Sequence, residues 1–126
     1  MADVGIVLIS HSPKIAAGIK DIIRQVITEV PIETAGGTDE NEIGTNIDKI
    51  LNAMEAADTG KGVLLFYDIG SAKMNAEMAI EMSEKENSML IDAPLVEGSY
   101  VAAVEAGMGK SLQEVHDAVI KSFSKR

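Results

Sequence analysis

Residues 63–71 read VLLFYDIGS, an uninterrupted apolar and aromatic run that ends in polar and small residues. A strand without polar alternation is typical of a parallel sheet that is covered by helices on both faces. The run at residues 4–9, VGIVLI, has the same character. We therefore expect both runs to form central, fully buried strands.

Weaker strands are expected at residues 32–35 and 88–92, and amphipathic segments separate the four strands. Helices are predicted at residues 13–27, 42–57, 72–83, 96–106 and 112–123. The predicted inner face of the first helix contains Ile15, Ile19, Ile22, Ile23, Val26 and Ile27, and Ile43 is placed on the inner face of the second. Ser12 is a suitable N-cap before Pro13, and Ser111 with Glu114 has the pattern of a capping box.

The alternation of strands and helices predicts an α/β fold, with a mainly parallel four-stranded sheet and helices on both faces. For such a doubly wound sheet we expect the strand order 2-1-3-4. No linker or internal repeat interrupts the sequence, so residues 1–126 are interpreted as one domain.

The composition limits the classes of partner. Lys and Arg total 11 against 20 Asp and Glu, which gives a formal charge of −9. Such a field repels nucleic acid and anionic lipid, so neither is an expected partner. The sequence has no cysteine, which excludes disulfides and thiolate metal sites. No apolar run is long enough for a signal peptide or a membrane span, and we expect a cytoplasmic protein.

Ligands of open parallel sheets bind beyond the carboxyl ends of the strands, where the strand order reverses. In the predicted order, residues 10–13 and 68–71 meet at that point, and they bring His11 beside Asp68. Helix N-termini attract anions and disfavour an imidazolium, while a carboxylate can fix the tautomer of the ring. A lone histidine at a strand end is often only structural, but this combination favours His11 as a nucleophile for phosphorus, oriented by Asp68.

Other residues of these loops are candidates to line a phosphoryl group. The candidates are the hydroxyls of Ser10, Ser12 and Ser71, the backbone of Gly70, the neighbouring loop at Gly37 and Thr38, and the cations of Lys14 and Lys73. The glycine-rich segment lacks the Lys-Ser/Thr ending of a phosphate-binding loop, so ATP binding is poorly supported. His116 is predicted to be structural or solvent-facing. With only two histidines and no cysteine, we expect no metal site, and no cofactor is predicted.

Met74, Met78 and Met82 recur at helical spacing on one face of the third helix. This pattern favours core packing or a subunit contact, with a flexible partner surface as a second interpretation.

The residues alone leave three classes of function open. The first is phosphoryl transfer through His11. The second is a non-catalytic module that holds an anion at His11 without bonding to phosphorus. The third is a small-molecule enzyme, such as an isomerase, that uses His11 and Asp68 as acid and base.

Three segments in succession carry a family resemblance: GIVLISHS at residues 5–12, AGGT at 35–38 with IGTN at 43–46, and YDIGSA at 67–72. Together they resemble the DhaM family, the phosphotransferase subunits of PTS-dependent dihydroxyacetone kinases, over the whole chain. The sequence is more distantly similar to the mannose-family IIA (EIIA) domains of the sugar phosphotransferase system (PTS). The context of His11 and the loop at residues 36–38 favour DhaM over a mannose-type IIA domain, which passes its phosphate to a IIB domain.

The resemblance implies a phosphohistidine carrier. The histidine that matches His11 accepts phosphate from the phosphocarrier HPr, and the aspartate that matches Asp68 supports it. The phosphate then passes to ADP in the DhaL kinase subunit, and the resulting ATP phosphorylates dihydroxyacetone bound to DhaK. Members are typically homodimers. Because the sequence stops at Arg126 without fused HPr-like or enzyme I-like domains, we expect it to depend on a separate HPr.

Overall fold

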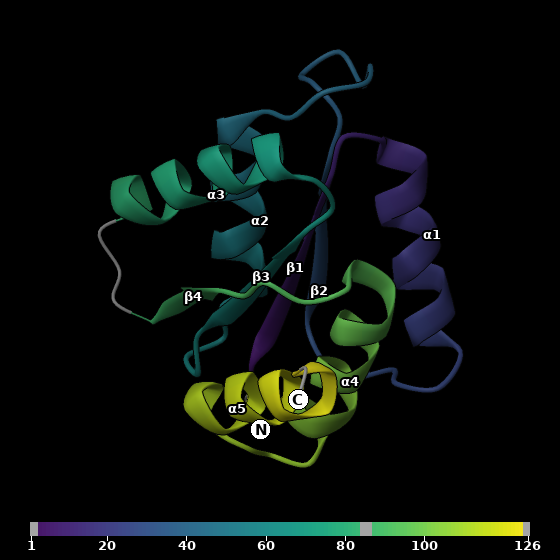
Figure 1. Ribbon diagram of the computed structural model, residues 1–126, viewed down its shortest axis with the longest axis vertical. Coiled ribbons are helices and arrows are strands. Elements are labelled where there is room, and N and C mark those ends of the chain that lie inside the picture. Colours follow the sequence, from purple (N-terminus) through teal and green to yellow (C-terminus); the bar gives the residue numbers. More distant parts are fainter. Residues whose placement is uncertain (1–2, 84–86, 125–126) are drawn as a thin grey trace.

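The computed structural model describes residues 3–83 and 87–124 and contains a four-stranded sheet (Figure 1). The strands are β1 (Gly5–Ser10), β2 (Ile32–Gly36), β3 (Val63–Tyr67) and β4 (Ser88–Leu90). Their order is β2-β1-β3-β4, and every pair of neighbours is parallel. The predicted sheet, with β1 and β3 at its centre, is therefore confirmed.

Helices cover both faces of the sheet (Figure 1). They are α1 (Pro13–Arg24), α2 (Ile47–Ala57), α3 (Gly70–Ser83), α4 (Leu95–Gly107) and α5 (Leu112–Phe123). Helices α1, α4 and α5 pack on one face, and α2 and α3 pack on the other. Within the described ranges, no helix combines the length and the apolar character that crossing a bilayer would require.

The central strands are apolar throughout because both of their faces are covered. Successive side chains of a strand point to opposite faces. Ile6 and Leu8 of β1 accordingly contact the core beneath α1, α4 and α5, whereas Val7 and Ile9 contact the core beneath α2 and α3. All four side chains are fully buried. A polar residue at any of these positions would lose its hydration without gaining a partner.

Two predicted helix starts are confirmed by their capping contacts. Ser12 accepts a hydrogen bond from the amide of Ile15 at 3.2 Å, and Pro13 occupies the first helical position of α1. At the start of α5, Ser111 and Glu114 each accept a hydrogen bond from the other's backbone amide.

The start of α2 differs from the prediction. The helix begins at Ile47 instead of residue 42, and Ile43 is 75% exposed instead of packing inward. Gly44 has a φ of +143°, which interrupts helical geometry, and the side chain of Asn46 caps the helix by accepting from the amide of Lys49. The five residues before Ile47 therefore belong to a loop that reaches the edge of the sheet.

The apolar face of α1 is narrower than predicted. Only Ala16, Ile19 and Ile23 are fully buried on this helix, because they follow the spacing that aligns side chains along one line. Three predicted core residues lie outside that line and are more than half exposed: Ile15, Ile22 and Val26. The helix also ends earlier than predicted, at Arg24.

Five further elements have boundaries that differ from the prediction by one or two residues. Strand β1 occupies residues 5–10 instead of 4–9, β2 extends by one residue to Gly36, and α4 extends by one residue at each end. Strand β4 ends at Leu90, where its pairing with β3 ends. Helix α3 starts at Gly70 instead of residue 72, so Gly70 and Ser71 lie in its first turn and not in a loop.

Gly5 allows the end of α2 to approach β1 closely. A Cβ atom at this position would lie 2.2 Å from the carbonyl oxygen of Ala57. Backbone atoms at both sites are fixed by the fold, so neither can move away cheaply. Gly18 on α1 is different, because no atom beyond its chain neighbours and the backbone of its own helix lies within 4 Å of its hypothetical Cβ.

These two glycines give a matched pair of predictions. Gly5→Ala should lower the free energy of unfolding by about 3 kcal/mol, because overpacking against backbone forces the elements apart. Gly18→Ala should raise it by about 0.5 to 1 kcal/mol, because alanine has the higher helix propensity. Chemical denaturation measures both, and equal effects of the two substitutions would contradict this account of Gly5.

Candidate functional site

The parallel pairing of β1 with β3 brings the two predicted loops together. Ile9 lies beside Tyr67 in the register, so the residues that follow each strand emerge next to each other. Nδ1 of His11 lies 3.0 Å from Oδ1 of Asp68. Each of these two side chains is 19% exposed. The predicted proximity of His11 and Asp68 is thus present in the structure. The two side chains are partly buried and lie at the carboxyl ends of the central strands β1 and β3.

Asp68 holds both the backbone and the ring of His11. Its Oδ2 accepts from the amide of His11 at 2.9 Å and from the hydroxyl of Ser10 at 3.0 Å. Its Oδ1 also accepts from the amide of Ile69 at 2.7 Å. Burial raises the pKa of Asp68, but the hydrogen bonds from His11, Ile69 and Ser10 outweigh it, so the pKa lies below its ordinary value. Asp68 is therefore a carboxylate at neutral pH.

The contacts of the His11 ring assign its tautomer. An ionised carboxylate only accepts hydrogen bonds, so Nδ1 carries the proton that faces Asp68. In the neutral ring, Nε2 then has a free lone pair. The hydroxyl of Ser71 lies 2.7 Å from Nε2 and donates to it. Nε2 is therefore the ring nitrogen that can act as a nucleophile.

The two serines that flank His11 have other partners. Ser10 is fully buried, and its hydroxyl accepts from the amide of Ser12 at 3.0 Å while donating to Asp68. Ser12 accepts from Ile15 as the N-cap of α1. Both hydroxyls therefore have hydrogen-bond partners within the protein. Of the three candidate serines, Ser71 is the one whose hydroxyl meets the His11 ring.

The glycine-rich loop borders the site as the sequence suggested. The amide of Gly37 donates to the carbonyl of Ser10 at 3.1 Å. The hydroxyl of Thr38 accepts from two amides of its own loop, those of Glu40 and Glu42. Gly44 was not among the predicted site residues, although its loop was expected beside His11, and its amide donates to the carbonyl of His11 at 2.9 Å. The glycine could be seen in the sequence, whereas its partner was visible only in three dimensions.

The structure also places the two candidate lysines and the second histidine. Lys14 and Lys73 are exposed in the first turns of α1 and α3. His116 lies on α5, a helix on the face opposite α3, and its Nδ1 contacts Asp117 at 3.2 Å. In the described part of the chain, no three His, Cys, Asp or Glu side chains are grouped to hold a metal ion.

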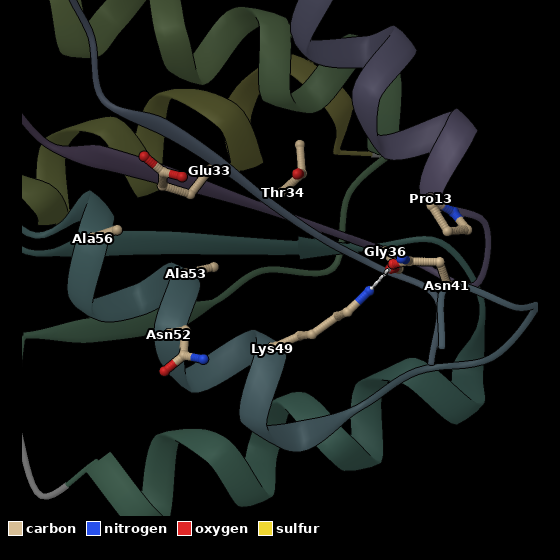
Figure 2. Close-up of a pocket in the computed structure, with 9 residues that line it drawn as sticks. All are labelled: Pro13, Glu33, Thr34, Gly36, Asn41, Lys49, Asn52, Ala53 and Ala56. Atoms are coloured by element: carbon tan, nitrogen blue, oxygen red, sulfur yellow. Dashed lines mark hydrogen bonds between the residues drawn. The ribbon is translucent and has the colours of Figure 1, made fainter. Parts of the chain in front are cut away.

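A pocket of about 420 Å³ lies beside this loop, between the free edge of β2 and α2 (Figure 2). Its lining includes Pro13, Glu33, Gly36, Asn41 and Lys49, but it does not include His11. The ammonium group of Lys49 reaches across it to the carbonyl of Gly36 at 2.9 Å. This lysine thus fixes the base of the loop to α2.

Comparisons with known proteins identify the family. Residues 5–116 match the model of the family described as the PTS system fructose IIA component, EIIA-man. A Listeria innocua phosphoryl donor subunit DhaM of PEP-dependent dihydroxyacetone kinase 1 is 46% identical, over 94% of each chain. The Lactococcus lactis phosphotransferase subunit DhaM is 38% identical, over 93% of this chain and 94% of its own. The Escherichia coli DhaM is 35% identical over 89% of this chain, which spans 25% of that longer protein.

Two solved structures have a similar fold. The crystal structure of a protein of unknown function matches with a TM-score of 0.86 and 33% identity, over 100% of this chain and 98% of the other. A sigma-54 interaction domain protein from Enterococcus faecalis, at 17% identity and a TM-score of 0.75 over 97% and 91% of the two chains, shares the fold. The chain belongs to the EIIA-man family of the phosphotransferase system and, within it, to the DhaM subunits.

Proposed function

We propose that this chain is the phosphoryl-donor subunit of a PEP-dependent dihydroxyacetone kinase and that His11 carries the phosphoryl group on Nε2. The observation that carries this proposal is the pairing of the two ring nitrogens. Nδ1 faces the carboxylate of Asp68 at 3.0 Å, and Nε2 faces the hydroxyl of Ser71 at 2.7 Å. This arrangement leaves a lone pair on Nε2, supported by a fixed negative charge behind the ring.

The transfer step requires no proton at Nε2. Its lone pair forms a bond to the phosphorus of phosphorylated HPr, and the bond between that phosphorus and the donor's nitrogen breaks. Positive charge develops on the His11 ring, and the carboxylate of Asp68 stabilises it through the Nδ1 proton. The hydroxyl of Ser71 turns from Nε2 to an oxygen of the phosphoryl group. In the second step, a phosphate oxygen of ADP attacks phosphorus, and the bond to Nε2 breaks.

The first turn of α3 is better suited than that of α1 to receive the phosphoryl oxygens. At α1, the amide of Ser12 is bound by Ser10, that of Ile15 is bound by Ser12, and Pro13 has no amide proton. At α3, Gly70 and Ser71 are the first two helical residues, whose amides have no partner within a helix. We therefore assign the anion to the N-terminus of α3, where the positive end of the helix dipole also stabilises its negative charge.

The names of the relatives support the role of phosphoryl donor. Two of them are described as phosphoryl donor subunits of dihydroxyacetone kinases in Listeria innocua and Escherichia coli. From the family resemblance, we propose that ADP bound to DhaL takes the phosphoryl group and that DhaK holds dihydroxyacetone. HPr is the proposed donor, and the exchange takes place in the cytoplasm. In this scheme, the chain needs no cofactor or metal of its own, and residues 1–126 act as one domain.

His11→Ala should abolish labelling of this chain by phosphoenolpyruvate, enzyme I and HPr, because Nε2 is the attacking atom. Wild-type protein should take up one acid-labile, base-stable phosphoryl group per chain. Mass spectrometry and the stability of the label at low and high pH measure this. His116→Ala is the matched control and should label normally. Label that persists in His11→Ala would refute the assignment.

The same labelled protein distinguishes the acceptors. An ADP-loaded DhaL should discharge it and form ATP, whereas a IIB domain of a sugar transporter should not. Discharge by the IIB domain alone would identify a IIA component of a sugar system. A wild-type chain that binds phosphate but never becomes labelled would be a non-catalytic anion-binding module.

Asp68→Asn should slow phosphoryl transfer about 10- to 100-fold, because the ring loses a charge-assisted hydrogen bond and its fixed tautomer. The substitution should also alter the response of stability to pH. The pKa of Asp68 is lower in the folded chain than in the unfolded chain. Its stabilising contribution is thus complete above the ordinary value of about 4 and is lost as pH falls through the folded value.

Chemical denaturation at pH 6, 4 and 3 tests the direction of this pH dependence of stability. The free energy of unfolding of wild-type protein should fall more steeply below pH 4 than that of Asp68→Asn. Parallel curves would mean that the carboxylate gains no stability from its hydrogen bonds with His11, Ile69 and Ser10.

We further propose that the chain is a homodimer that pairs through α3. Met74, Met78 and Met82 are 72%, 50% and 55% exposed, so these three side chains are not used to fill the core. The core side of α3 consists instead of Ala72, Ala76 and Ala79. Contiguous exposed methionines are typical of surfaces that contact another protein.

Met78→Lys should convert the dimer into a monomer, because a charge in an apolar interface would be desolvated without a partner. Sedimentation equilibrium measures the mass. Met108→Lys is the control, since Met108 is 66% exposed and lies beyond the end of α4. A dimer that survives Met78→Lys, or dissociates equally in both variants, would place the interface elsewhere.

A further inference from the structure

The loop between β2 and α2, residues 37–46, holds the backbone of His11 through its carbonyl, in addition to the contact of Asp68 with its amide. The amide of Gly44 donates to the carbonyl of His11 at 2.9 Å. The amide of His11 itself donates to Oδ2 of Asp68 at 2.9 Å. The backbone of His11 is thus fixed through both its amide and its carbonyl. A displacement of Gly44 would move the histidine relative to the groups around its ring.

The base of this loop is anchored to α2. Lys49 donates to the carbonyl of Gly36 at 2.9 Å and to Oδ1 of Asn41 at 2.6 Å (Figure 2). The other end of the loop lies around Gly44. This glycine has a φ of +143°, and a Cβ on it would lie 2.7 Å from the methyl group of Thr38. The two hydrogen bonds of the Lys49 ammonium group therefore hold Gly36 and Asn41, whereas the contact with His11 is made by Gly44.

Asn75 connects that part of the loop to α3. Its side-chain amide donates to the hydroxyl of Thr45, the residue directly after Gly44. Asn75 lies four residues after Ser71, so both side chains project from the same face of α3. Ser71 contacts Nε2 of His11. One face of α3 therefore touches the reactive nitrogen at one turn and the loop that holds the His11 carbonyl at the next.

These contacts form a closed ring: His11 to Ser71, along α3 to Asn75, then to Thr45, and through Gly44 back to His11. We propose that Asn75 is a positioning residue that keeps Nε2 of His11 aligned with the first turn of α3, where the phosphoryl group is to be received. This inference rests on the proposed function for its consequence in catalysis. Its structural part, the coupling of Asn75 to Gly44, stands independently of that function.

The fold does not need this hydrogen bond. Helices α2 and α3 already pack together through buried apolar side chains, among them Ala53, Ala72 and Ala76. The side chain of Asn75 is only partly buried, as is that of Thr45. Loss of the bond should therefore loosen the loop locally and leave the core intact, which separates positioning from overall stability.

Asn75→Ala and Thr45→Val each remove the bond, and Thr45→Ser retains the hydroxyl. Single-turnover phosphorylation by excess phosphorylated HPr gives the maximal rate and the half-saturating concentration separately. We expect the first two variants to lower the maximal rate about 5- to 10-fold, as for loss of a neutral hydrogen bond, with a half-saturating concentration within about twofold of wild type. Thr45→Ser should keep a near-normal rate, and the double variant Asn75→Ala/Thr45→Val should be no slower than either single one.

A second readout needs no phosphoryl transfer. In the unphosphorylated protein, exchange of the Gly44 amide with deuterium should be about 5- to 10-fold faster in Asn75→Ala, by the same loss of one hydrogen bond. Asn52→Ala is the matched control, since Asn52 is an exposed asparagine on α2, and it should change neither quantity.

The outcomes are distinguishable. Wild-type Gly44 exchange in Asn75→Ala, additive losses in the double variant, or a change in the half-saturating concentration alone would each overturn the positioning role. If wild-type protein takes no phosphoryl group, the proposed function fails, and amide exchange still decides whether Asn75 holds the loop. If Asn75→Ala is too unstable to assay, the contrast between Thr45→Val and Thr45→Ser decides it.

Discussion

The site depends on one interaction, the set of hydrogen bonds that Asp68 makes with His11. One carboxylate oxygen accepts from the ring, and the other accepts from the backbone amide of the same residue. Amides and the buried hydroxyl of Ser10 keep the carboxylate ionised despite its partial burial. A fixed negative charge on one side of the ring therefore determines which nitrogen is free on the other side. The sheet order matters for chemistry because it brings this carboxylate to this histidine.

The two helices that begin beside His11 have different roles. Helix α1 satisfies its own first turn through Ser10, Ser12 and Pro13 and thereby fixes the loop that carries the histidine. Helix α3 places Ser71 against the ring at its first turn. A rigid support on one side and available donors on the other are what the proposed phosphoryl transfer through His11 requires.

Much of the fold could be predicted because the relevant signals are local. The uninterrupted apolar runs of β1 and β3 can be stable only as strands covered on both faces. That requirement predicted the doubly wound sheet and the point at which its strand order reverses. The errors arose where periodicity alone was used. Ile15, Ile22 and Ile43 are apolar and suitably spaced but are exposed, because a helix buries only the line of side chains that meets the sheet. Met74, Met78 and Met82 are exposed on α3, which excludes core packing and leaves the other two interpretations, a subunit contact and a flexible partner surface.

The sequence by itself determined the strand order, the two loops that meet at the carboxyl ends of the central strands, and therefore the proximity of His11 and Asp68. Only the tertiary structure decided which nitrogen of His11 faces Asp68, that Ser10 supports the carboxylate from a buried position, and that Gly44 and Asn75 belong to the same network. The physical reason is the range of the information. Strand and helix signals lie within about ten neighbouring residues, whereas a hydrogen bond between Asn75 and Thr45 depends on how two packed elements are placed to within a fraction of an ångström.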